Sequence, residues 1–322
     1  MSDKIESPLN LNRKFKSSFI NGDVDLRLLV GVVWQSKLAV FISIITFTIS
    51  ATLYAINQPN IYQSEVLLAP ADSEQSGGGL AALAGQFGGL ASIAGINLGG
   101  AGSVSKIQLA VEVVKSRRFI FDFIERHNIL LELMAADGWD MGTNVLSYDE
   151  DIYDVNTNQW VRNVSAPLKK IPSLQEAYKE FRNIFYIYID EETGMIRISI
   201  EHVSPYIAQQ WVNWLVKDIN NEMKELDVSE AKKSTEFLKK QLELTNVADI
   251  KSVLYSLIEE QAKTIMFANV RDEYVFKTID PALIPEEKIK PKRAIMCILG
   301  GVFGLIVGVL FVLFKSLRVK NS

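Results

Sequence analysis

Residues 294–314 read AIMCILGGVFGLIVGVLFVLF and decide the fold of this chain. The run contains no charged residue, and a helix of this length, at about 1.5 Å per residue, spans the roughly 30 Å hydrocarbon core of a bilayer. A second apolar run, residues 38–56, lies near the N-terminus. We therefore expect two transmembrane helices, one at each of these runs.

The residues between the two runs, 57–293, are predicted to form one domain outside the bilayer. The chain has 322 residues and a formal net charge of −4. Roughly 240 residues lie between the runs, enough for a single domain with a hydrophobic core. The acidic balance argues against a nucleic-acid partner, since proteins of that class usually have a basic face. The single cysteine, Cys297, lies inside the second run, so no disulfide can form within the chain.

The first run is expected to be a retained membrane anchor, because 37 residues precede it and because it is longer than the apolar region of a typical signal peptide. Two spans put both termini on one side of the membrane. Basic residues in the tails, 1–37 and 315–322, favour the cytoplasmic side, and residues 23–37 are predicted to form an amphipathic helix on the bilayer surface. This preference of basic residues for the cytoplasmic side is counted mainly over short loops, not over large domains. We therefore keep this orientation despite four basic residues just before the second span: Lys288, Lys290, Lys292 and Arg293.

The first part of the outer domain is predicted to contain a strand, a glycine-rich segment and two short helices. Residues 61–70 have the composition of a strand. Residues 77–102 are rich in Gly, Ala and Leu but contain no Gly-Lys-Ser/Thr, so a nucleotide-binding loop is not indicated. They are either a flexible loop or a segment that rests on the bilayer or a neighbouring subunit. Apolar spacing predicts helices near 107–114 and 120–124, whereas residues 134–171 are predicted to be irregular.

A capping box and a hairpin are predicted next. Ser173 and Glu176 have the spacing of a capping box, which starts a helix that runs to about Phe181. Alternating apolar residues at 186–189 and 195–200, joined by residues 190–194, predict a β-hairpin.

A very long helix follows the hairpin. Neither proline nor glycine interrupts residues 206–246, so a helix starting at Pro205 would be about 60 Å long. Its first half has an apolar face that we expect to be buried, whereas its second half is polar and needs support from elsewhere. That support is expected from a returning helix at 249–270 and from neighbouring chains, with a last strand at 274–279. The expected apolar face consists of Trp211, Leu215, Ile219, Met223 and Leu226.

Residues that could carry chemistry are few. His127 and His202 have no cysteine or second histidine at metal-ligand spacing, so both are expected to be ordinary histidines. The acidic cluster at 149–151 lacks the alternating order of a calcium loop and is expected to be solvated. No G-x-S-x-G is present. We therefore predict no catalytic, cofactor-binding or metal-binding residue, and a protein that is not an enzyme.

Gly300, Gly304 and Gly308 repeat at a spacing of four residues in the second run. This spacing places them on one helix face and lets another helix backbone approach closely. Glycine is also common in membrane helices without any such role. We predict a transmembrane packing face whose partner is either the first span or another subunit.

The order of these features resembles the Wzz-type chain-length determinants, the polysaccharide co-polymerases of Gram-negative inner membranes. The most specific match is a family motif before the second span. It consists of Pro281, Pro285, Pro291, Lys292 and Arg293. Weaker matches are spread over most of the chain: 24–37, Tyr62-Gln63-Ser64, 116–119 and Val203-Ser204-Pro205.

This resemblance implies a non-catalytic regulator of the length of a surface polysaccharide, typically lipopolysaccharide O-antigen. It also implies a ring-like homo-oligomer with long helices in the periplasm, beside a membrane polysaccharide polymerase and its glycan chain. A related branch carries a cytoplasmic tyrosine kinase domain. We expect this chain to lie outside that branch, because it stops at Ser322 without a Walker motif.

We therefore predict an α+β fold in which a membrane-proximal mixed α/β base carries a long projecting helical hairpin, flanked by two transmembrane helices. The expected segments are 1–37, 38–56, 57–293, 294–314 and 315–322. The alternative is a two-span periplasmic sensor or adaptor, which would need a separate cytoplasmic partner for its output. A membrane-tethered hydrolase or transferase is disfavoured because no catalytic grouping is present.

Overall fold

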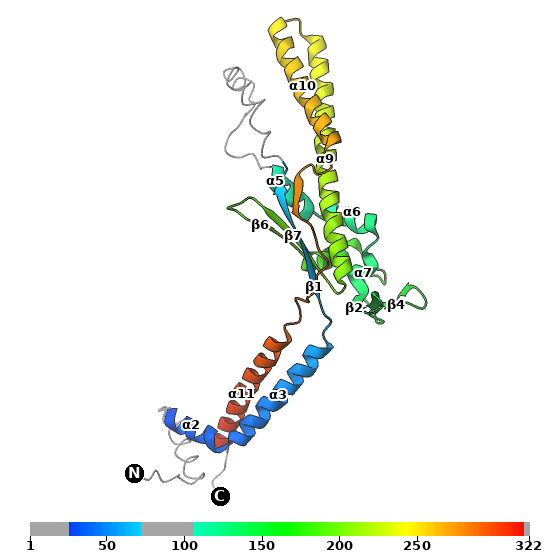
Figure 1. The fold of residues 1–322 in the computed structure, drawn as a ribbon. Helices are drawn as coiled ribbons and strands as arrows, with labels where there is room; N and C mark the ends of the chain where they lie inside the picture. Colours follow the sequence, from blue (N-terminus) through cyan, green and yellow to red (C-terminus); the bar gives the residue numbers. More distant parts are fainter. Residues whose placement is uncertain (1–25, 72–105, 319–322) are drawn as a thin grey trace. The chain divides into compact units, whose positions relative to one another are not determined.

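The computed structural model describes residues 26–71 and 106–318 (Figure 1). The chain divides into two compact units, one made of Met1–Asn60 with Ile289–Ser322 and the other of Ile61–Lys288. The predicted glycine-rich segment 77–102 lies outside the described residues. The class expected from the sequence is confirmed: helices and strands are mixed, with two long apolar helices and a long helical hairpin.

In its described residues the first unit contains three helices: α2 (Leu26–Gln35), α3 (Lys37–Asn57) and α11 (Arg293–Arg318). Two of them, α3 and α11, are long and apolar enough to cross a membrane. They run side by side in opposite directions. Large apolar side chains on their outer faces are exposed, among them Phe41 at 63% and Phe311 at 61%. Such exposure is expected of helices whose solvent is lipid.

The second unit is built on a four-stranded antiparallel sheet with the order β6-β7-β1-β8. The predicted first strand, the hairpin and the last strand are therefore confirmed. The four strands are β1 (Tyr62–Pro70), β6 (Phe185–Ile189), β7 (Ile196–His202) and β8 (Phe276–Asp280).

Helices cover the sheet and enclose the core. The capping box is present as predicted, with the Ser173 side chain accepting from the Glu176 amide and the Glu176 side chain accepting from the Ser173 amide. Phe123, Phe181 and Trp211 are each 1% exposed or less and belong to one core cluster with the sheet residues. The covering helices are α5 (Lys106–Lys115), α6 (Arg117–His127), α7 (Leu130–Ala135), α8 (Leu174–Ile184) and α9 (Pro205–Leu244).

The 40-residue helix α9 confirms the predicted long helix, and α10 (Ala248–Val270) returns along its second half (Figure 1). The predicted buried face holds as far as Met223, which is fully buried. It is wrong for Leu226, which is 41% exposed. The reason is that the core becomes thinner beyond Met223, where Val228 is only partly buried against it, so the same helical face continues past the layer that fully covers it.

Asn220 joins α9 to the last strand. Its side-chain oxygen accepts from the amides of Val275 and Phe276 at 2.8 and 2.9 Å, and its side-chain nitrogen donates to the Phe276 carbonyl at 3.1 Å. The residue is 3% exposed. A buried amide with its donor and acceptor both in use fixes the position of β8 against α9.

The prediction that residues 134–171 are irregular is wrong in part, because two small hairpins form there. They are β2 (Ala136–Asp140) with β3 (Val145–Tyr148), and β4 (Tyr153–Asp154) with β5 (Gln159–Trp160). The strands are too short for alternation to reveal them. Their turns carried a signal instead: Asp-x-x-Thr-Asn occurs at 140–144 and at 154–158.

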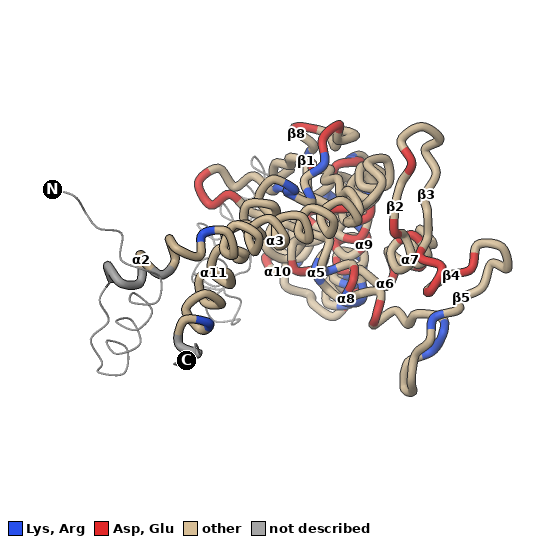
Figure 2. Tube along the Cα trace, turned by 90° about the horizontal axis from the view of Figure 1, so that it is seen from below, with Lys and Arg blue, Asp and Glu red and all other residues tan. Residues whose placement is uncertain are grey.

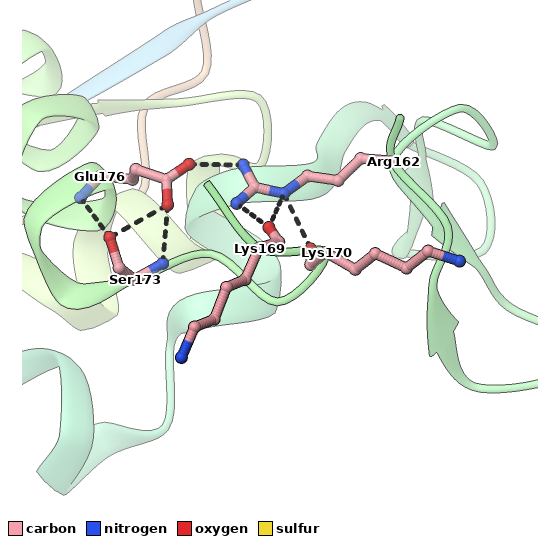
Figure 3. A network of polar contacts seen from close by, with 5 residues as sticks. All are labelled: Arg162, Lys169, Lys170, Ser173 and Glu176. Carbon is pink, nitrogen blue, oxygen red and sulfur yellow. Dashed lines mark hydrogen bonds and ion pairs between the residues drawn. The ribbon is translucent and has the colours of Figure 1, made fainter. Parts of the chain in front are cut away.

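The segment after β5 is fixed to α8 by Arg162 (Figure 3). The Arg162 guanidinium lies 2.7 Å from a carboxylate oxygen of Glu176 and also donates to the carbonyls of Lys169 and Lys170. The hydrogen bond from Arg162 lowers the pKa of Glu176 to about 2, and the Ser173 amide assists. One ion pair thus holds the capping box and the preceding loop together.

We expect Arg162→Gln to lower the free energy of unfolding by about 1–3 kcal/mol near neutral pH, because a charged donor to three acceptors is lost. Glu176 has a depressed pKa in the folded state, so its contribution is present above its ordinary pKa of 4.5 and is lost as the pH falls towards about 2. The difference in free energy of unfolding between the parent and Arg162→Gln should therefore become smaller over that acidic range. Thermal unfolding of the purified protein over a pH series measures it.

The control is Lys169→Gln, because Lys169 takes part through its backbone carbonyl. This variant should unfold like the parent at every pH. A deficit of Arg162→Gln that stays constant from neutral to acidic pH would contradict the assignment.

Candidate functional site

The predicted glycine face of α11 lies against α3 of the same chain. A Cβ atom added at Gly300 would lie 2.5 Å from the Cβ of Ala51, and one added at Gly304 would lie 2.9 Å from the Cα of Ile44. At Gly308 the corresponding distance, to the Cα of Val40, is 3.1 Å. These distances leave no room for a side chain at Gly300 or Gly304 unless the helices separate. That the glycines serve as a transmembrane packing face remains our prediction.

Polar side chains link α3 and α11 along the same contact. The Ser43 hydroxyl donates to the Gly304 carbonyl at 2.8 Å, and the Thr52 hydroxyl lies 3.3 Å from the Cys297 sulfur. Hydrogen bonds of this kind contribute to helix association in lipid, where water does not compete for them.

Arg293, the last residue of the predicted family motif, is the first residue of α11. Its guanidinium donates to the Ala55 carbonyl at 3.1 Å and to the side-chain oxygen of Asn60 at 3.2 Å. Ala55 lies in the last turn of α3, where backbone carbonyls have no partner within the helix. Arg293 therefore satisfies the C-terminal end of α3, a role that the sequence pattern did not reveal.

The remaining motif residues lie along the path between β8 and α11. Pro281 directly follows β8, and the next residue, Ala282, is buried with its carbonyl accepting from the Gln209 side chain. Pro285 is half-buried. Pro291 and the exposed Lys292 precede α11. The structure therefore does not gather the motif into one site, but spreads it along this path.

The second half of the hairpin made by α9 and α10 leaves much apolar surface uncovered. The structure describes every residue of α10, and within this helix only Ala268 is fully buried. The apolar residues along one face of α10 are half-buried, except that Ile250 is 48% exposed: Val253, Leu254, Leu257, Ile258 and Ile265. Other large side chains of the hairpin are exposed to solvent: Phe237 is 61%, Leu244 78% and Tyr255 59% exposed. Large apolar side chains exposed in this number on one hairpin favour an interaction surface.

Both histidines have ordinary partners, as predicted. His127 Nε2 lies 2.9 Å from a carboxylate oxygen of Asp218, which also pairs with Arg126, and its ring stacks on Trp214. His202 accepts from the Ser204 amide and lies 3.2 Å from the Glu132 carbonyl. Burial lowers the pKa of His202 to about 4, so it is neutral at ordinary pH.

The acidic cluster at 149–151 forms a turn between β3 and β4. The side chain of Asp149 accepts from the Asp151 amide at 2.9 Å. Glu150 and Asp151 are exposed. Over residues 26–71 and 106–318, no three His, Cys, Asp or Glu side chains are grouped so that they could hold a metal ion.

Two protein families match the sequence. Residues 22–127 match the family described as "Chain length determinant protein", Wzz. Residues 237–317, from the second half of α9 to α11, match "G-rich domain on putative tyrosine kinase". The chain therefore carries a Wzz chain length determinant domain and, nearer its C-terminus, a match to the G-rich domain. The Wzz match covers α2, α3, β1, α5 and α6, so it includes one of the two candidate spans and the first strand of the sheet. The resemblance seen in the sequence is thereby confirmed.

Solved structures give weaker similarities. A "full-length bacterial polysaccharide co-polymerase" is 14% identical, with a TM-score of 0.37, over 90% of this chain and 97% of the other. A fragment of WzzB, the polysaccharide co-polymerase from Salmonella Typhimurium, is 14% identical, with a TM-score of 0.27, over 72% of this chain and 100% of the other. No curated protein sequence matches this chain.

The contact between α3 and α11 can be tested by a disulfide. We expect Thr52→Cys to form a disulfide with the native Cys297 on mild oxidation, because the two side chains already lie 3.3 Å apart. Adding Gly304→Leu should lower the yield several-fold, because a leucine cannot fit against the backbone of Ile44. Counting free thiols with a maleimide after denaturation gives the yield.

Val302→Leu provides the matched control, since Val302 is 52% exposed two residues away on the same helix. It should leave the disulfide yield unchanged. Equal yields for the Gly304→Leu and Val302→Leu proteins would rule out the close contact.

Proposed function

We propose that this protein is an inner-membrane regulator of the chain length of a surface polysaccharide, lipopolysaccharide O-antigen. In this proposal it acts without catalysis, as an oligomeric scaffold on the membrane polymerase and its growing glycan chain. The match of residues 22–127 to the chain length determinant family supports the proposal. Both termini are cytoplasmic and the segment 57–293 is periplasmic, as the basic tails favour.

The observation that carries the proposal is the exposed apolar surface of the hairpin made by α9 and α10. A single chain covers the first half of α9 with the sheet, but the second half has α10 as its packing partner. The exposure of Phe237, Leu244 and Tyr255 supports a further partner on this hairpin. A second copy is the simplest one, and a repeated interface of this type generates closed rings when the rotation between copies closes.

A ring of hairpins gives a physical means to influence polymer length. Several identical copies hold the polymerase at a fixed place and offer the growing glycan a surface of fixed extent. The polymerase would then release the chain when the glycan no longer finds new surface. The chemistry of extension stays with the polymerase, which agrees with a scaffold that has no catalytic residues of its own.

The decisive test is deletion of the gene followed by a gel of the surface polysaccharide. We expect polymer to be made still, but without a clustered length distribution, because the polymerase would act unregulated. Complementation with the parent gene should restore the cluster. A deletion strain with an unchanged distribution, or with no polymer at all, would refute the proposal.

The role of the hairpin is tested by Phe237→Gln. We expect this change to weaken association between copies by about 1–3 kcal/mol, in the range of exposed aromatic residues that become buried at interfaces. The length cluster should broaden or shift at normal protein level. Mass photometry of the protein in nanodiscs measures association, and the gel measures the length.

Lys239→Gln is the control, because it also introduces a glutamine, at an exposed position of α9 two residues away. It should leave both association and polysaccharide length unchanged. Phe237→Gln with normal association and a normal length distribution would remove the hairpin from the proposal.

A further inference from the structure

Three turns in the second unit share one geometry. In each, an aspartate side chain accepts from the amide of the threonine three residues later: Asp140 from Thr143, Asp154 from Thr157 and Asp190 from Thr193. The residue after each threonine has a positive φ, of 55° at Asn144, 53° at Asn158 and 69° at Gly194. The three turns can therefore be compared position by position.

The residue that follows the aspartate differs between the turns. In the two small hairpins it is apolar and exposed: Met141 at 71% and Val155 at 53%. In the turn between β6 and β7 it is Glu191, which is exposed and charged. The turn geometry is the same in all three and does not require an apolar residue at this position. The apolar tips are therefore a property of the two small hairpins.

Behind these tips the two hairpins carry aromatic rings. Trp139 of β2 lies 5.7 Å from the ring of Tyr62 and 6.0 Å from that of Tyr206. In the second hairpin, Tyr153 lies 5.3 Å from Trp160 and 6.0 Å from Tyr148. Tryptophan and tyrosine gather at membrane–water interfaces, where an apolar ring with a polar edge is favoured.

The contact with Tyr62 fixes the hairpin β2–β3 to the end of the unit at which the chain enters from a span, and the contact between Tyr148 and Tyr153 joins the second hairpin to the first. Tyr62 begins β1, and four residues separate it from Asn57, the last residue of α3. Five extended residues reach at most about 17 Å. The chain leaves the unit at the same end, because the hydroxyl of Ser64 donates to the Leu283 carbonyl at 2.7 Å. The segment that arrives from α3 therefore ends at Tyr62, and the segment that leads to α11 starts near it.

We propose that the hairpins β2–β3 and β4–β5 dock on the lipid surface, with Met141 and Val155 entering the interfacial layer. This inference rests on the two spans and does not depend on the proposed function. Figure 2 shows acidic residues on β2, on β4 and between the hairpins, with basic residues beyond β5. Asp140 and Asp154 are engaged in their own turns. The docking is therefore apolar, and it does not require anionic lipid.

The experiment uses the full chain in nanodiscs of zwitterionic phosphatidylcholine. Cys297→Ser removes the single cysteine, and a nitroxide spin label is attached to one new cysteine at a time: Met141→Cys, Val155→Cys or Glu191→Cys. The third variant is the control, because it occupies the equivalent position of the third turn. Collision rates with oxygen and with a water-soluble nickel chelate are measured for each label.

Oxygen is enriched in lipid and the nickel chelate is excluded from it, so the ratio of their collision rates reports contact with lipid. We expect this ratio to be several-fold higher at positions 141 and 155 than at 191, and unchanged when a third of the lipid is anionic. A label at 141 and 155 as accessible to nickel as at 191 would overturn the proposal. Low accessibility to both reagents would also overturn it, because it would show that protein, such as a second copy, covers the tips.

Discussion

One helix, α9, serves two environments, and the rest of the second unit follows from this. Its first half buries Trp211, Leu215 and Ile219 against the sheet and closes the core. Its second half extends past that core, where α10 is its packing partner within the chain. A helix without a continuous core on one face depends on packing from other helices, since propensity alone gives little stability in water. The exposed aromatic and aliphatic residues on the hairpin are the direct result.

The first unit meets the opposite constraint. In lipid, apolar side chains gain nothing by facing one another, so α3 and α11 are held by close backbone approach and by polar contacts. The backbones lie close together at Gly300, Gly304 and Gly308, and Ser43, Thr52 and Arg293 supply the polar contacts. The spans need these few specific contacts because general hydrophobicity would hold them in the bilayer but not to each other.

Much of the fold could be predicted from the sequence because its signals are local. Pro205 and the absence of glycine and proline after it predicted α9, and Ser173 with Glu176 predicted the start of α8. The small hairpins were missed, although the pattern Asp-x-x-Thr repeats the turn at 190–194 that was correctly assigned. Leu226 was misplaced because periodicity gives the face of a helix but not the point at which its covering layer ends.

The candidate sites were less predictable, because they depend on residues far apart in the chain. The spacing of the glycines indicated a face, but it could not say whether α3 or another subunit would meet it. The carbonyl that Arg293 satisfies lies 238 residues away, and the partner of His127 lies 91 residues away. No local pattern encodes such pairs, since they result from how the elements pack.

The three hydrogen bonds between Asn220 and residues 275–276 give the second unit a mechanical property. They tie the middle of α9 to β8, the edge strand from which the chain continues towards α11. A force along the axis of α9 is thus transmitted to that strand through hydrogen bonds from the Asn220 side chain instead of through sliding apolar surfaces. A partner that pulls on the hairpin of α9 and α10 must therefore also pull on β8 before it can displace α9.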